Sequence, residues 1–170
     1  FHFRDKKVFL DLYKRYVRVH LEFATPVWSP WQTGDINILE KVQQKAVSMI
    51  AGLQGSDYEA KLKELKLLSL VNRRNRADMI HLFKIINNIG SVEPATWLQV
   101  VNITRPNTRA INHNNGVINF HIPVKRTEIS KNFFSVRAAI YWNNLPDNVK
   151  QVQTLPVFKK RLDKYLETLA

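Results

Sequence analysis

Apolar residues recur at three- and four-residue spacings along most of this chain, and that periodicity predicts a mainly α-helical fold. The spacing is sustained over stretches long enough to form helices of several turns. The expected helices cover about residues 6–22, 35–51, 57–65, 70–88, 130–143 and 154–169.

Within these helices the apolar residues form stripes that we expect to face the interior. In the first helix the stripe consists of Val8, Phe9, Leu12, Tyr13, Tyr16 and Val17. In the second it consists of Ile38, Leu39, Val42, Ala46, Met49 and Ile50. In the long helix it consists of Ala77, Ile80, Phe83 and Ile86. In the last helix it consists of Phe158, Leu162, Tyr165, Leu166 and Leu169.

Capping residues indicate where several helices begin and end. Ser56, with Glu59 three residues later, has the pattern of a capping box. Ser69 and Thr154 are the expected caps of the long helix and of the last helix, and Gly90 is expected to close the long helix.

One stretch departs from the helical spacing. Residues 114–116 read Asn-Asn-Gly, a hairpin-turn signal, and apolar residues alternate over 118–122 as in a strand. We therefore expect a helical bundle over residues 1–90. A smaller region with a β-hairpin and two helices is expected to pack on it over residues 97–170, with the boundary at 90–97.

The balance of charge is strongly basic. Lys and Arg number 26 against 14 Asp and Glu, which gives a formal net charge of +12 and a pI near 10.1. A folded domain this basic repels itself, so a polyanionic partner is expected, with nucleic acid first and an anionic membrane surface second. No apolar run is long enough for a transmembrane helix. The first residues lack a start or signal pattern and the last lack a helix stop, so we expect a fragment of a longer protein.

The residue types of most catalytic sites are missing or scattered. The chain has no cysteine, which excludes disulfides, thiolate nucleophiles and zinc sites that contain cysteine. Its carboxylates stand among basic residues and do not cluster as two-metal catalysis requires, and its five histidines lack zinc spacing. We expect no catalytic site and no bound cofactor or metal in this chain.

Eight basic residues are the candidate phosphate contacts: Arg73, Arg74, Arg76, Lys61, Lys63, Lys66, Lys131 and Arg137. The three arginines at the start of the long helix stand so close together that they repel each other, and phosphate oxygens would relieve this repulsion. Contact with the backbone of a nucleic acid is indicated rather than readout of bases. A merely solvated helix face is the alternative interpretation.

Aromatic residues also allow two interpretations. They either stack on nucleobases or belong to the core, and their helical spacing beside leucine and isoleucine favours the core. The residues concerned are Trp28, Trp31, Phe133, Phe134, Tyr141 and Trp142.

Several strings of residues, in their order and spacing, resemble reverse transcriptases of LINE-type non-LTR retrotransposons of the jockey and chicken-repeat type. The first string is Leu12-Tyr13-Lys14-x-Tyr16-Val17-Arg18-x-His20-Leu21-Glu22-Phe23-Ala24-x-Pro26-Val27-Trp28-Ser29-Pro30, which resembles the segment after the palm. The next strings are Leu39-Glu40-Lys41-Val42-Gln43-Gln44-Lys45-Ala46, Tyr58-Glu59-x-x-Leu62-Lys63-x-Leu65 and Arg73-Arg74-x-x-Ala77-Asp78-Met79. The distal strings are Lys131-Asn132-Phe133-Phe134-Ser135-x-Arg137, Trp142-Asn143-x-Leu145-Pro146 and Phe158-Lys159-x-x-Leu162.

The resemblance implies that residues 1 to about 88 are a polymerase thumb and that the rest is the C-terminal region beyond it. It implies that the palm, with its Tyr-x-Asp-Asp motif and divalent metal, and the fingers belong to an upstream part of the same polyprotein. The implied partners are RNA and DNA in a template–primer duplex, and the implied location is a nuclear and cytoplasmic ribonucleoprotein, not a secreted form. The chain lacks the Cys-rich knuckle that some other LINE lineages carry near the C-terminus.

Other function classes stay open. A domesticated protein-interaction module could keep the fold without binding nucleic acid, and duplex binding at low salt separates the two. A peripheral membrane module could use a basic amphipathic helix such as residues 154–169, which sedimentation with anionic vesicles would reveal. The preference between RNA and DNA, the role of residues 97–170 and the activity of the source element do not follow from the sequence.

Overall fold

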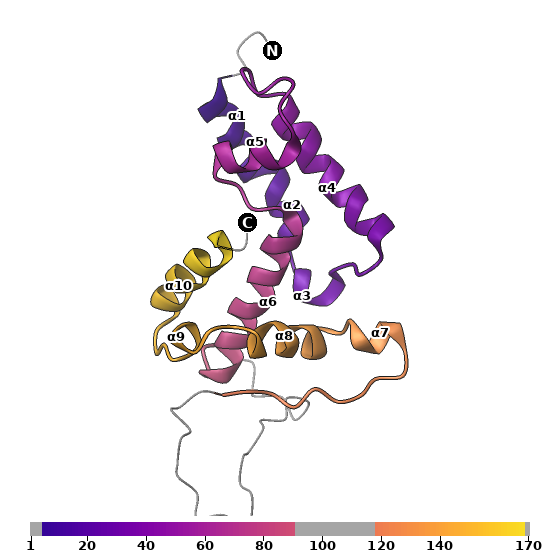
Figure 1. Ribbon diagram of the computed structural model, residues 1–170, viewed down its shortest axis with the longest axis vertical. Coiled ribbons are helices and arrows are strands. Elements are labelled where there is room, and N and C mark those ends of the chain that lie inside the picture. Colours follow the sequence, from indigo (N-terminus) through magenta and orange to yellow (C-terminus); the bar gives the residue numbers. More distant parts are fainter. Residues whose placement is uncertain (1–4, 91–117, 169–170) are drawn as a thin grey trace, which may run out of the picture. The chain divides into compact units, whose positions relative to one another are not determined.

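A computed structural model describes residues 5–90 and 118–168. The described chain is mainly helical, as the periodicity predicts, and it divides into two compact units, Phe1–Asn75 and Arg76–Ala170 (Figure 1). The division falls within the long helix α6, Leu70–Ile86. The predicted boundary at 90–97 lies almost entirely outside the described residues and stays a prediction.

The first unit begins with a helical segment in three parts. These are α1 (Lys6–Leu12), the π-helical turn η1 (Tyr13–Val17) and α2 (Arg18–Glu22). The backbone N–H of Arg18 donates to the carbonyl of Tyr13, five residues earlier, which is the spacing of a π-helix. The helix predicted over 6–22 is therefore confirmed in extent, with a wider turn in its middle.

Three helices and the start of a fourth complete this unit. They are α3 (Thr25–Trp28), α4 (Thr33–Ser48), α5 (Tyr58–Leu65) and the start of α6. Side chains from α4, α5 and the turns after them form the core: Val47, Ile50, Leu53, Leu62, Leu65 and Leu67. Phe9, Leu10 and Tyr58 pack against this core from one side.

The second unit contains the rest of α6 and four more helices. These are α7 (Glu128–Lys131), α8 (Phe134–Asn143), α9 (Asp147–Lys150) and α10 (Leu155–Glu167). Its centre is aromatic: Phe158 stacks on Phe83 with ring centroids 4.3 Å apart and on Trp142 at 5.8 Å. Phe158, Leu162 and Leu166 are buried, as the stripe of the last helix predicts, and Leu169 lies outside the described residues.

The predicted β-hairpin is not found in the part that the structure describes. Its turn at 114–116 lies outside the described residues. Over 118–122 the chain forms no strand, and Phe120 makes an isolated bridge. The side-chain amide of Asn143 takes the role of a neighbouring strand: Phe120 N donates to Asn143 Oδ1 at 2.9 Å, and Asn143 Nδ2 donates to Phe120 O at 2.8 Å.

Three further predictions need correction. The capping box at Ser56 is wrong, because Asp57 is the N-cap of α5 and its side chain makes no capping bond. The helix predicted over 130–143 is two helices, α7 and α8, separated by Asn132 and Phe133. The stripe of the second helix faces the core only in part, because Ile50 is buried in the core whereas Ile38, Val42 and Met49 are exposed.

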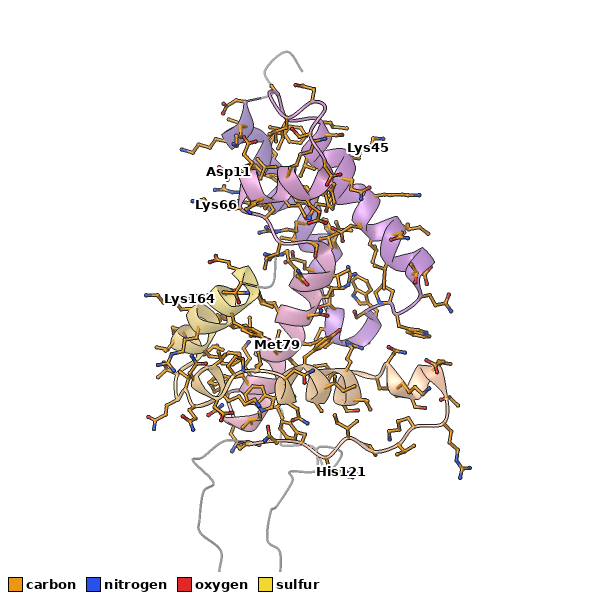
Figure 2. All side chains as sticks on the ribbon, in the orientation of Figure 1. Asp11, Lys45, Lys66, Met79, His121 and Lys164 are labelled. Atoms are coloured by element: carbon orange, nitrogen blue, oxygen red, sulfur yellow. The ribbon has the colours of Figure 1, made fainter. Side chains whose placement is uncertain are left out.

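Charged side chains lie on the surface of both units. Lys45 and Lys66 extend from the first unit and Lys164 from the second (Figure 2). Ser69 caps α6 as predicted, since its Oγ accepts from Asn72 N at 3.2 Å.

The Asn143–Phe120 pair predicts a clear stability effect. Asn143→Ala removes both hydrogen bonds and leaves a partly buried peptide group unsatisfied, so it should lower the free energy of unfolding by about 1–3 kcal/mol. Urea unfolding measures this, with the exposed neighbour Asn144→Ala as control. Equal unfolding midpoints for the two variants would show that the pair does not hold this segment.

Candidate nucleic-acid interface

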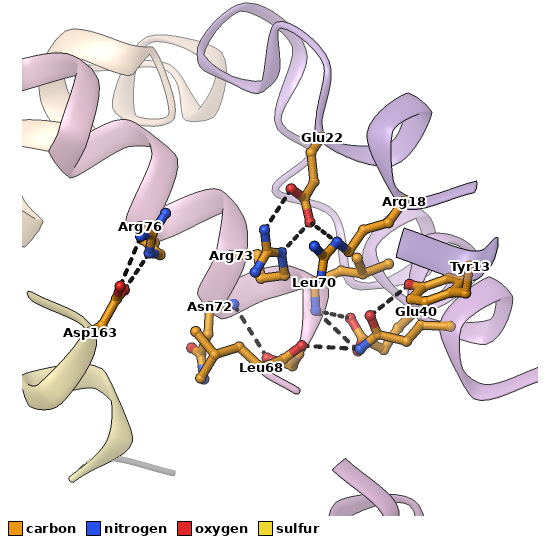
Figure 3. A network of polar contacts seen from close by, with 12 residues as sticks. Tyr13, Arg18, Glu22, Glu40, Leu68, Leu70, Asn72, Arg73, Arg76 and Asp163 are labelled. Atoms are coloured by element: carbon orange, nitrogen blue, oxygen red, sulfur yellow. Dashed lines mark hydrogen bonds and ion pairs between the residues drawn. The ribbon is translucent and has the colours of Figure 1, made fainter. Parts of the chain in front are cut away.

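Arg73 lies in an ion pair inside the first unit rather than in open solvent. Its guanidinium binds both carboxylate oxygens of Glu22, with Nη2 donating to Oε2 at 2.8 Å (Figure 3). Arg18 Nε also approaches Glu22, at 3.4 Å. Glu22 therefore balances two arginines, and the charge of Arg73 is satisfied without phosphate.

Arg76 is paired in the second unit. It binds both oxygens of Asp163 on α10, with Nη2 donating to Oδ2 at 2.9 Å (Figure 3). About a quarter of the Arg76 side chain and two-fifths of that of Asp163 are exposed. Phosphate would have to displace this carboxylate, so contact between Arg76 and a nucleic acid stays a prediction.

Arg74 does not fit the predicted interface. Its side chain is only 2% exposed, so its guanidinium lies in the interior of the protein. A phosphate cannot reach it without a rearrangement of the chain. The prediction of three adjacent surface arginines is therefore corrected, because α6 turns Arg74 inward between Arg73 and Arg76.

The two distal candidates are also paired. Arg137 Nε donates to Asp78 Oδ2 at 2.7 Å, and its Nη1 donates to the carbonyl of Asn132 at 2.7 Å. Asp78 is 1% exposed, so Arg137 neutralises a buried charge. Lys131 makes an exposed pair with Glu128 at 2.5 Å, which solvent weakens.

The lysines in α5 and at its C-terminal cap, called here the lysines of α5, are available to bind an external anion. Lys63 and Lys66 are exposed and Lys61 is half-buried, and no ion pair joins these three to another described residue. Lys66 stands at the C-terminal cap of α5 with a left-handed backbone, φ +50°. Their charges are therefore directed to solvent, where polyanions bind.

Helix α10 presents a second basic face that was not among the predicted contacts. Lys160, Arg161 and Lys164 are exposed, opposite the buried residues of that helix. The i,i+4 spacing of Lys160 and Lys164 was the signal in the sequence that indicated this face.

The aromatic candidates divide between core and surface. Trp142 is buried and Phe134 packs edge-on against His81 with centroids 5.3 Å apart. Trp28, Trp31 and Phe133 are exposed, so the core interpretation is wrong for these three residues.

A buried polar network positions α5 and α6, and periodicity gave no sign of it. Gln43 is fully buried; its Oε1 accepts from the Tyr13 hydroxyl at 2.7 Å, and its Nε2 donates to the Tyr58 hydroxyl at 2.9 Å and to Leu68 O at 3.1 Å. The Tyr58 hydroxyl also donates to Glu40. The Glu40 carboxylate accepts from Leu70 N at 3.1 Å (Figure 3). A carboxylate thus lies at the positive N-terminus of α6.

The environment of the network raises the pKa of two tyrosines. Burial raises the pKa of Tyr13 well above its ordinary value of 10.0. Burial, together with the hydrogen bond to Glu40, likewise raises the pKa of Tyr58. Both phenols therefore stay protonated at pH values where exposed tyrosines ionise.

A polar cleft of about 370 Å³ lies in the second unit and is lined in part by Lys150. Lys150 Nζ donates to Asn119 Oδ1 and to the carbonyl of Asn143, both at 3.0 Å, and burial lowers its pKa. This lysine supports the segment that contains Phe120.

Neither a metal cluster nor a membrane span stands out in residues 5–90 and 118–168. No three carboxylate or imidazole groups there converge as ligands of a metal ion would. None of the helices in those ranges combines the length and the apolar character that crossing a bilayer requires.

Comparison of the chain with protein-family models, with curated proteins and with solved structures found no match.

Arg137→Ala tests whether this arginine has a structural role. The substitution leaves the buried Asp78 carboxylate without its counter-ion, so it should lower the free energy of unfolding by about 3–5 kcal/mol. Lys131→Ala, which breaks an exposed pair, should cost about 0–1 kcal/mol. Denaturant unfolding of both variants gives the comparison, and equal losses would contradict a buried role for the Arg137–Asp78 pair.

The tyrosine network predicts stability that is lost in alkali. Below the ordinary tyrosine pKa of 10.0 the contribution is fully present. As pH rises toward the raised folded values, ionisation favours the unfolded chain and the contribution is lost. In an ultraviolet titration of tyrosinate, Tyr13→Phe and Tyr58→Phe should each remove one group that ionises late. Loss of an early-ionising group in either variant would contradict the network.

Proposed function

We propose that this chain is a non-catalytic, nucleic-acid-binding part of a LINE-type reverse transcriptase, and that exposed lysines hold the phosphate backbone of a template–primer duplex. The observation that carries the proposal is the division of the positive charge. Arg73, Arg76 and Arg137 have carboxylate partners inside the protein, whereas Lys63 and Lys66 are exposed with no such partner among the described residues.

The lysines suit backbone tracking for physical reasons. An ammonium group is a compact point charge on a flexible stem, so it follows a phosphate chain without reading bases. The net charge of +12 leaves an excess after every acidic residue is matched, and release of counterions from a duplex would make binding favourable.

The order of sequence strings supports the reverse transcriptase part of the proposal. Chemistry would then belong to the palm of the longer polyprotein, with its divalent metal, and this chain would hold the duplex. The upstream palm and fingers would be its covalent partners. The mainly helical fold is compatible with a thumb.

Binding of an RNA–DNA hybrid tests the proposal. Fluorescence anisotropy across about 50 to 200 mM salt should show an affinity that falls steeply as salt rises. Lys63→Gln with Lys66→Gln should weaken binding uniformly across sequences and reduce the salt slope by about 2, since each lost phosphate contact removes close to ~1. Lys160→Gln with Lys164→Gln measures the contribution of α10 in the same way.

Lys41→Gln with Lys45→Gln is the matched control, because it removes the same charge from the first unit at two exposed positions on α4. Equal salt slopes for the control and for the α5 variant would show that binding depends on net charge alone and not on a particular set of lysines. Absence of binding at the lowest salt would overturn the proposal and favour the domesticated protein-interaction module.

A further inference from the structure

An open apolar groove crosses the first unit between its first helical segment and α4. Its volume is about 550 Å³. Its walls are Phe9, Leu12, Tyr13, Tyr16 and Val17 on one side and Lys41, Val42, Lys45, Ala46 and Met49 on the other. All of these residues belong to one compact unit, so the groove has a defined shape.

The apolar residues of the groove come from the two stripes that the sequence predicts to be buried. Tyr16 is 67% exposed, and Leu12, Val17, Val42 and Met49 are each more than one-third exposed. Meanwhile α4 buries another side, with Gln43 and Val47 in the interior. Helix α4 therefore has a second apolar face that the described chain leaves open, and apolar surface of this kind marks an interaction site.

The backbone contributes to the shape of one wall. Tyr13, Tyr16 and Val17 belong to the π-helical turn η1, and such turns occur preferentially at functional sites. The buried Tyr13–Gln43 hydrogen bond joins this wall to α4.

The charged residues that line the groove are all positive. Its lining includes two cations, Lys41 and Lys45, which stand one turn apart on α4, and it includes no carboxylate from the described residues. Figure 2 shows Lys45 extending outward from α4. A ligand that fits this groove needs an apolar surface that contacts the floor and negative charges that pair with the two lysines.

We propose that the groove binds an amphipathic helix with acidic flanks from another polypeptide. An apolar helix face inserts between two helices as a third member of a bundle, and carboxylates on its edge pair with Lys41 and Lys45. This surface is separate from the lysines of α5 that the proposed function uses.

Other occupants fit the groove less well. A second copy of this chain would bring no acidic helix, because no helix of the described ranges carries a net negative charge. A bilayer is nearly flat and does not enter a concave groove. A small ligand requires several convergent polar groups, whereas this floor is made of hydrocarbon and aromatic side chains.

Designed peptides of about 18 residues test the groove. A panel shares one helical frame, with Leu, Met or Phe on the apolar face and either Glu or Lys on both flanks. Each peptide is titrated into the complete 170-residue chain, with methyl and backbone NMR shifts as the readout of position. The acidic peptides should bind at least ~10-fold more tightly than the basic ones and shift Leu12, Val42 and Met49.

Charge reversal gives the sharper result. Lys41→Glu with Lys45→Glu should reverse the preference, so that the basic peptides bind more tightly. Lys63→Glu with Lys66→Glu reverses the same number of charges outside the groove. This variant should keep the preference for acidic peptides. Val42→Ser, at an exposed position, should weaken both kinds of peptide several-fold without unfolding the protein.

Four outcomes would overturn the proposal. Equal binding of acidic and basic peptides would show that the lysines select nothing. No binding across the panel up to about 1 mM would show that the groove is not a helix site. Self-association lost on Val42→Ser would identify a second copy as the occupant. Sedimentation with vesicles of phosphatidylserine and phosphatidylcholine, lost in the same variant, would identify a lipid surface.

Discussion

Neutralisation of arginines by carboxylates from distant parts of the sequence is the interaction on which this structure depends. Glu22 binds Arg73 in the first unit, and Asp163 binds Arg76 and Asp78 binds Arg137 in the second. These pairs allow α6 to carry a dense basic sequence inside a folded protein. The pairing also separates the positive charges by role. The arginines stabilise the fold, and the exposed lysines are left for an external anion.

The sequence predicts the helices well because periodicity is a local property. It could not predict the ion pairs of α6, since their members stand 51, 59 and 87 residues apart. Nor could it predict that Arg74 is buried between two partly exposed arginines, because three neighbouring cations look alike in a sequence.

Apolar stripes indicate that a face will be covered, but not by what. Val42 and Met49 belong to a stripe of the expected kind, yet the described chain leaves them open and buries Gln43 on the same helix. Gln43 is buried because three hydrogen-bonding groups from other elements surround its amide: the phenols of Tyr13 and Tyr58 and the main-chain carbonyl of Leu68. Such a network depends on tertiary positions that no local pattern encodes.

We propose that lysines of α5, rather than the arginines of α6 or the lysines of the groove, contact the nucleic acid. Acetylation of the folded protein with and without an RNA–DNA hybrid, followed by mass spectrometry of each lysine, tests it most directly. We expect the hybrid to protect Lys63 and Lys66 and to leave Lys41 and Lys45 as reactive as before. Protection of Lys41 and Lys45 with Lys63 and Lys66 unchanged would contradict it.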